Sequence, residues 1–194
     1  GFLWWSILSL LCGFGAILLA ATTTERRAIP RTRVIWLVIL LLGYFPTWAT
    51  VQLGQVSLFL FLLLVIAWAA ARQGKNMTAG VAVGVAMLLK IFVLVLIPFF
   101  LVQRRWRLAG WSLGVFGAGI LVSLALFGVD AHRAYVAVLG DITWYAANWN
   151  ASLLGFFTRI LGGSENTPAI DAPWMARGLA YGLALALLVV LLWL

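Results

Sequence analysis

The chain has 194 residues, of which 65% are hydrophobic and 9% are charged, and its formal net charge is +8. Soluble domains have roughly 25% charged residues, so this composition excludes a water-soluble fold. One cysteine and one histidine exclude a disulfide framework and most metal sites, and we expect no metal and no cofactor. The basic residues separate apolar runs of roughly 20 residues, the length of a membrane-spanning helix. A membrane lipid, and no nucleic acid, is therefore the expected partner of the positive charge.

Six apolar segments predict an all-α fold, a polytopic bundle of transmembrane helices. The segments are residues 2–22, 34–51, 56–71, 78–102, 108–129 and 175–194. The positive-inside rule places the short basic connections 25–33, 72–75 and 104–107 in the cytoplasm. The connection over about residues 130–174 carries four acidic and two basic residues, so we expect it on the outer side.

The fourth segment, residues 78–102, does not fit a single crossing. One crossing would put the basic connections 72–75 and 104–107 on opposite sides of the membrane. We therefore predict that the segment breaks near Lys90 and returns as a re-entrant pair of half-helices, which leaves about five spanning helices. Residues 78–90 would form a helix of about 20 Å, shorter than the hydrocarbon core of about 30 Å. Non-helical backbone at that depth is tolerated only inside protein or beside a polar cavity.

Lys90 lies at the predicted break. An ionisable side chain within a membrane segment costs at least about 2.5–3.5 kcal/mol on insertion scales, so it indicates a functional site. Its compact ammonium suits a phosphate or pyrophosphate head group. The structural alternatives are a lysine whose stem reaches the nearby interface, or one that pairs with a carboxylate.

Further candidate residues lie on the expected outer side. Gln55 can donate to and accept from a sugar or a lipid head group, and capping the third helix is its structural alternative. The stretch 144–160 combines aromatic side chains with Asn150, Ser152 and Arg159, a pattern that suits carbohydrate or prenyl chains. A surface helix that covers the bundle explains that stretch equally simply. His132 is the single histidine of the chain, and both an interfacial and a substrate-binding role fit it.

The order and spacing of these residues resemble glycosyltransferase family 87, the polyprenol-phosphate-mannose-dependent mannosyltransferases of the GT-C superfamily. The resemblance covers about residues 34–160. Its elements are a Gly-Gln pair that opens a helix, an Ala-Gly stretch before a membrane-embedded lysine, a basic turn, and an Asn-x-Ser in a later outer connection. In this chain they are Gly54–Gln55, Ala79–Gly80, Lys90, residues 104–107, and Asn150 with Ser152.

The chain departs from the family pattern directly after its lysine. The family usually continues with a Phe-Pro that breaks the helix, whereas Ile91 and Phe92 follow here and the next proline is Pro98. Proline removes a backbone donor and clashes with the preceding turn. The predicted break near Lys90 therefore lacks its usual cause.

The resemblance implies an enzyme that transfers a sugar, expected to be mannose, from a polyprenyl-phosphate donor to a glycolipid or glycan acceptor on the extracytoplasmic face. The expected substrate-binding residues are Lys90, Gln55, Asn150, Ser152, Arg159 and His132. Such enzymes use a carboxylate as general base. The chain opens on Gly1 within an apolar run, so we interpret residues 1–194 as a single transmembrane domain fragment and expect the base upstream of Gly1.

A membrane transporter or lipid flippase is the alternative function. Broken helices and a buried lysine also form the substrate sites of transporters. Transporters usually contain an internal repeat, and none is convincing here. In both cases we expect a multi-pass protein of a bacterial plasma or inner membrane, in the cell envelope.

Overall fold

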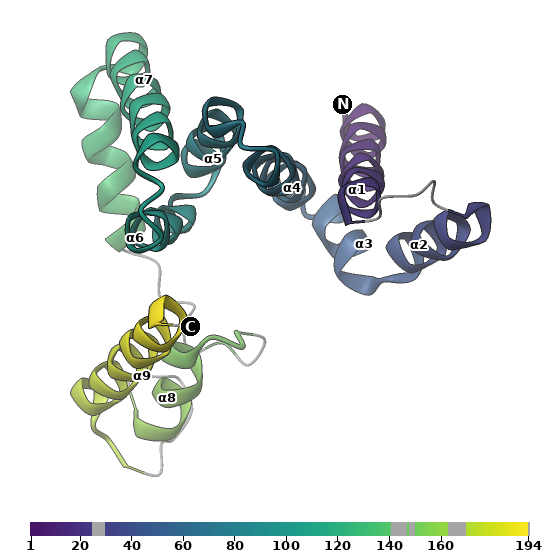
Figure 1. Ribbon diagram of the computed structural model, residues 1–194. Coiled ribbons are helices and arrows are strands. Elements are labelled where there is room, and N and C mark those ends of the chain that lie inside the picture. The colour runs from purple at the N-terminus through teal and green to yellow at the C-terminus, as the bar shows by residue number, and fades with distance from the viewer. Residues whose placement is uncertain (25–29, 141–146, 148–149, 163–169, 194) are drawn as a thin grey trace. The chain divides into compact units, whose positions relative to one another are not determined.

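The computed structural model describes residues 1–24, 30–140, 147, 150–162 and 170–193, and every regular element in these ranges is a helix (Figure 1). The all-α prediction is therefore confirmed. Tertiary contacts divide the chain into two compact units, Gly1–Ser123 and Leu124–Leu194. We call them unit 1 and unit 2.

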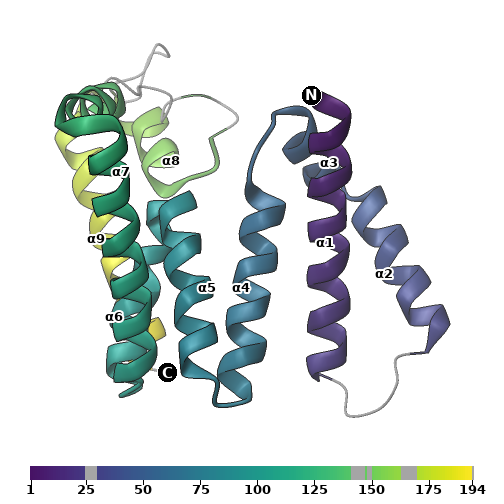
Figure 2. The same ribbon diagram turned by 90° about the horizontal axis from the view of Figure 1, so that it is seen from above.

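The described part of unit 1 contains six α-helices, one 3-10 helix and the beginning of α7. They are α1 (Phe2–Thr24), α2 (Arg31–Gly43), α3 (Phe45–Gln52), α4 (Ser57–Arg72), α5 (Asn76–Leu89), the 3-10 helix η1 (Ile91–Val95), α6 (Leu96–Val102) and α7 (Trp106–Gly140). Helices α1, α4, α5 and the first part of α7 lie side by side in a row, and α2 and α3 pack on α1 (Figure 2). Unit 2 contains the rest of α7, α8 (Leu153–Leu161) and α9 (Pro173–Trp193).

Three helices of the described chain are long and apolar enough to cross a membrane: α1, α7 and α9. A fourth span exists if α2 and α3, which meet at a bend of 55°, are counted as one. The expected number of about five was therefore too high. One reason is that α4 has 16 residues, a length of about 24 Å, which is short of the hydrocarbon core of about 30 Å.

The bend between α2 and α3 interrupts a stretch that the sequence predicted as one helix. Tyr44 takes an extended conformation with φ −83° and ψ 113°, and Pro46 lies in the first turn of α3. A proline there starts a helix well, because its missing N–H is not needed, but it disfavours continuing a helix from the preceding residues. The indole N–H of Trp48 donates to the carbonyl of Leu42 across the bend.

Small residues let α5 and α7 pack closely. A Cβ atom on Gly80 would lie 2.4 Å from Trp111 Cβ, and one on Gly84 would lie 2.6 Å from Val115 Cβ. Three successive contacts pair Gly80 with Trp111, Gly84 with Val115, and Leu88 with Gly119. The residue numbers rise by four on both helices, so α5 and α7 run parallel and begin at the same end of unit 1.

The parallel course of α5 and α7 requires the chain to return between them, as the sequence predicted. Lys90 ends α5 in an extended conformation, with φ −146° and ψ 108°, and η1 and α6 lead back to the start of α7 (Figure 2). Pro98 takes no part in this break. It lies in the first turn of α6, where its missing N–H has no helical partner to lose.

Helix α7 is broken at Gly128, where φ is 76° and ψ is 169°, close to the end near residue 129 that the sequence predicted. A second helical stretch follows this break and continues to Gly140. Residues 106–127 measure about 33 Å, which matches the hydrocarbon core. The expected outer connection, residues 130–174, therefore begins with helix and also contains α8, which packs on α9 in unit 2.

Candidate functional site

Lys90 lies at one end of unit 1, and the basic connections at residues 72–75 and 104–107 lie at the opposite end. Helices α4 and α5 are neighbours joined by the short turn at residues 73–75, so the beginning of α4 and the end of α5 lie together at the other end (Figure 2). Gln55 precedes α4 and Lys90 follows α5. The structure thus brings these two predicted site residues to one end of one unit.

The Lys90 side chain is half-buried and has no hydrogen-bond or ion-pair partner among the residues that the structure describes. Residues 1–123 contain a single acidic residue, Glu25, which lies outside the described residues. The alternative in which a carboxylate neutralises Lys90 therefore has no support within the described part of unit 1. Beside it, Ile91 and Phe92 are 69% and 65% exposed, so an ammonium group lies next to an exposed apolar surface.

Gln55 is exposed, and its backbone completes the end of α3. Its N–H donates to Thr50 O at 2.9 Å and the N–H of Gly54 donates to Val51 O at 3.2 Å, with Gly54 in the left-handed region at φ 63°. This is the Schellman arrangement that ends many helices. Helix α4 begins after Val56 without a side-chain cap, so the helix-capping alternative for Gln55 was wrong.

Asn150, Ser152 and Arg159 lie together at the start of α8 in unit 2. The hydroxyl of Ser152 accepts from the N–H of Gly155 at 3.0 Å and so caps the helix. Asn150 Oδ1 accepts from the N–H of Ser152 at 3.0 Å. The guanidinium of Arg159 donates to the carbonyls of Ala147 and Asn150, both at 2.9 Å. These bonds give all three side chains a structural role in shaping the chain before α8.

His132 lies apart from this group, beside the kink of α7. Its Nδ1 is 2.8 Å from the carbonyl oxygen of Gly128, one turn earlier. A left-handed residue at position 128 disrupts the regular helical hydrogen bonds, and a ring N–H can satisfy the carbonyl that is left. Nearby, Asp130 and Arg133 form an ion pair of 3.3 Å that is almost fully exposed.

Two buried polar groups in unit 1 were not identified from the sequence. Trp5 Nε1 and Ser9 Oγ are inaccessible and have no hydrogen-bond partner in the described structure. They lie one turn apart on α1, and the ring of Trp5 packs against Phe59 with the centroids 5.1 Å apart. The available sequence signal was a pair of serines, Ser6 and Ser9, within an otherwise apolar part of α1. Buried polar groups are usually satisfied, so a polar partner at this position would be stabilising.

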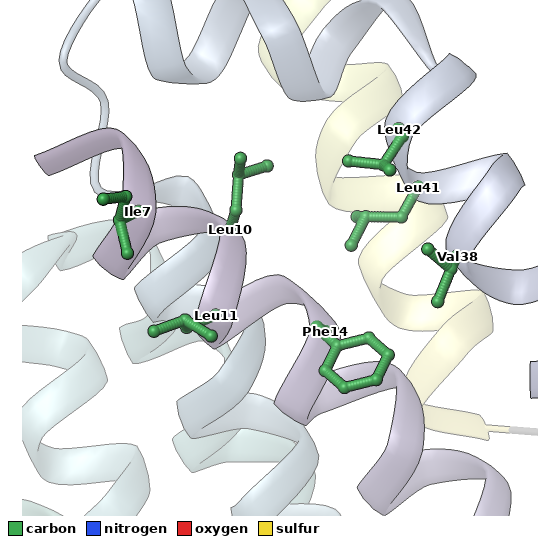
Figure 3. Close-up of a pocket in the computed structure, with 7 residues that line it drawn as sticks. All are labelled: Ile7, Leu10, Leu11, Phe14, Val38, Leu41 and Leu42. Carbon is green, nitrogen blue, oxygen red and sulfur yellow. The ribbon is translucent and has the colours of Figure 1, made fainter. Parts of the chain in front are cut away.

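A cavity of about 280 Å³ lies between α1 and α2, away from Lys90 (Figure 3). It is lined by Ile7, Leu10, Leu11, Phe14, Val38, Leu41 and Leu42. An all-hydrocarbon lining cannot orient a sugar or hold a phosphate, whereas a lipid chain fits it. Within the ranges that the structure describes, no three His, Cys, Asp or Glu side chains are grouped to hold a metal ion.

The fold and these residues define a multi-pass membrane protein with a re-entrant helix pair, at whose turn lies a lysine without an ion-pair partner in the described ranges. The chain belongs to Glycosyltransferase family 87, whose model matches residues 1–194. A relative in Mycolicibacterium smegmatis, a polyprenol-phosphate-mannose-dependent alpha-(1-2)-phosphatidylinositol pentamannoside mannosyltransferase, is 33% identical over 120 residues. That alignment covers 60% of this chain and 28% of the relative. No solved structure matches the chain. The family resemblance seen in the sequence is confirmed.

Proposed function

We propose that residues 1–194 form one membrane-embedded part of an enzyme that transfers mannose from polyprenol-phosphate-mannose to a glycolipid or glycan acceptor outside the cytoplasm. Family membership and the name of the mycobacterial relative support this reaction class and favour it over transport. The observation that carries the proposal for this chain is Lys90, a cation at a helix break with no partner among the described residues.

The proposed step is a displacement at the anomeric carbon of the donor. An acceptor hydroxyl forms the new C–O bond, the bond from that carbon to the phosphate oxygen breaks, and polyprenyl phosphate leaves with the electron pair. The hydroxyl proton goes to a carboxylate general base, which the described residues of unit 1 do not supply. A fixed positive charge aimed at the leaving group lowers the barrier, because charge on the phosphate increases as the bond breaks.

Lys90 is suited to hold the phosphate of the donor. Its ammonium can donate charge-assisted hydrogen bonds to the phosphate oxygens, and the exposed side chains of Ile91 and Phe92 can contact the first isoprene groups. Gln55, at the same end of unit 1, is the candidate for hydrogen bonds to the sugar hydroxyls. We place Asn150, Ser152, Arg159 and His132 in the proposal only as residues that shape unit 2.

The test is transfer by the complete enzyme in membranes, with a polyprenyl-phosphate-mannose donor and the variants Lys90→Ala and Lys90→Arg. A hydrogen bond to a charged group contributes about 1.5–3 kcal/mol, so Lys90→Ala should lower kcat about 10- to 150-fold. Lys90→Arg keeps the charge and should retain part of the activity. Arg31→Ala is the matched control, because Arg31 is an exposed cation at the start of α2 and should leave kcat unchanged.

Thermal unfolding of each variant shows whether the protein still folds. Removal of an uncompensated cation should leave the unfolding temperature unchanged or raise it, because a buried charge is costly. If a folded Lys90→Ala enzyme has the wild-type kcat, Lys90 does not contact the donor phosphate and the proposal is wrong.

A further inference from the structure

Two basic turns lie side by side at the end of unit 1 that is opposite Lys90. The first joins α4 to α5 and the second joins α6 to α7, and the parallel packing of α5 on α7 places their starts together (Figure 2). We call their five cations the basic end: Arg72, Lys75, Arg104, Arg105 and Arg107. These residues are distant in the sequence, so a positively charged surface of this density is a product of the fold.

The charges of the basic end are not neutralised within the described part of unit 1. Each of the five side chains is exposed, and none has an ion-pair partner there. Arg72 instead lies over the ring of Trp68, with Cζ 5.3 Å from the ring centroid. Like charges on neighbouring turns repel each other, so an anionic ligand that contacts several of them would stabilise the unit.

The turn before α7 has an arginine at the left-handed position, where the turns after α3 and α4 have a glycine. Three helices of unit 1 end in a Schellman arrangement, with Gly54, Gly74 and Arg104 at the left-handed position, where φ is 63°, 73° and 56°. At the third turn the N–H of Arg105 donates to Phe100 O at 2.8 Å. A non-glycine residue is strained in this conformation. Glycine would form the same turn without strain, so the geometry of the turn does not explain a charged residue at position 104.

Exposed tryptophans lie close to the basic end. Trp68 lies one turn before the first basic turn, and Trp106 and Trp111 lie in the first two turns of α7. They are 39%, 63% and 45% exposed. Tryptophan concentrates where a membrane meets water, with its ring among the head groups. We propose that the basic end binds the head group of an anionic phospholipid through Arg104, Arg105 and the neighbouring cations.

The experiment measures thermal unfolding of the complete protein in a zwitterionic detergent, with phosphatidylglycerol or phosphatidylcholine added. Phosphatidylglycerol should raise the unfolding temperature of the wild type in a saturable manner, and phosphatidylcholine should not. Each cation near an anionic surface contributes an affinity factor of about five, so Arg104→Gly should weaken phosphatidylglycerol binding about fivefold. The same variant should unfold at a higher temperature without lipid, because glycine relieves the strained conformation.

Arg104→Lys and Arg31→Gln are the matched variants. Lysine keeps both the charge and the strain, so Arg104→Lys should bind phosphatidylglycerol like the wild type and lack the increase in unfolding temperature. Arg31 is an exposed basic residue at the start of α2, outside the two turns, so Arg31→Gln should weaken phosphatidylglycerol binding less than Arg104→Gly does. The proposal is overturned if Arg104→Gly binds phosphatidylglycerol with wild-type affinity, if Arg31→Gln weakens binding equally, or if inorganic phosphate stabilises the protein as well as the lipid does.

Discussion

Gly84 is the position where a single methyl group should test the parallel packing of α5 on α7. A Cβ at this position would lie 2.6 Å from Val115 Cβ and 2.8 Å from the carbonyl oxygen of Ser112. Carbon atoms in contact are normally about 3.5–4.0 Å apart, so the two helices would have to separate by about 1 Å. Backbone and Cβ atoms cannot rotate away, and the strain must be relieved by movement of a whole helix.

The expected cost of Gly84→Ala follows from two opposing effects. An added methyl group in a well-packed contact costs about 1–3 kcal/mol. Replacing glycine by alanine within a helix returns about 0.5–1 kcal/mol. We therefore expect a net loss of up to about 2.5 kcal/mol, with a midpoint of about 1 kcal/mol. Gly80→Ala should behave similarly, because its Cβ would lie 2.4 Å from Trp111 Cβ. One separation of the helices accommodates both methyl groups, so the double variant should lose less than the sum.

The assay is thermal unfolding of the purified complete protein in detergent, with two glycines of α7 as controls. A Cβ atom added to Gly114 would have no neighbouring atom within 4 Å, so Gly114→Ala should be neutral or stabilising. The three atoms nearest to a Cβ on Gly119 all belong to the end of the Leu88 side chain, which can rotate, so Gly119→Ala should cost less than Gly84→Ala. An unfolding temperature for Gly84→Ala equal to that of Gly114→Ala would refute the parallel packing, and with it the common end of the two basic turns.

Two further predictions concern the start of α8. Arg159→Met removes two charge-assisted hydrogen bonds to backbone carbonyls, so amide hydrogen exchange at residues 150–152 should become at least about tenfold faster, and Arg159→Lys should restore only part of the protection. If amide hydrogen exchange is unchanged in Arg159→Met, the two hydrogen bonds of Arg159 do not order residues 150–152, and its guanidinium is available to bind a ligand. Ser152→Ala removes the cap of α8 and should cost about 1 kcal/mol in thermal unfolding, whereas Ser152→Asp should not. A fully stable Ser152→Ala protein that has lost transfer activity would instead make Ser152 a substrate contact.

The break at Lys90 was predictable from the distribution of charge, although no local signal marks it. The cations on both sides of residues 78–102 required the chain to return, and the structure shows the return. The bend at Tyr44 was missed, even though Pro46 was a local signal, because the apolar run continues across it. The predicted end of the fifth apolar segment near residue 129 agrees with the break at Gly128. Polar residues after Val129 indicated a connection, but a second helical stretch occupies that region as far as Gly140.

Some features of the candidate site were likewise predictable from the sequence, and others were not. The position of Lys90 at the helix break is confirmed, and its role in binding phosphate stays a prediction. The structural bonds of Arg159 could not be predicted, because its two carbonyl acceptors lie nine and twelve residues away and depend on how the chain before α8 folds. The buried groups of Trp5 and Ser9 depend equally on which helix covers them.

The return of the chain between α5 and α7 has a consequence for topology mapping. A reporter enzyme fused after Gly74 and one fused after Gln103 should be active in the same compartment, although a long apolar segment separates the two fusion points. A count of crossings based on hydropathy alone would assign them to opposite compartments. It would also reverse the assigned side of every residue that follows.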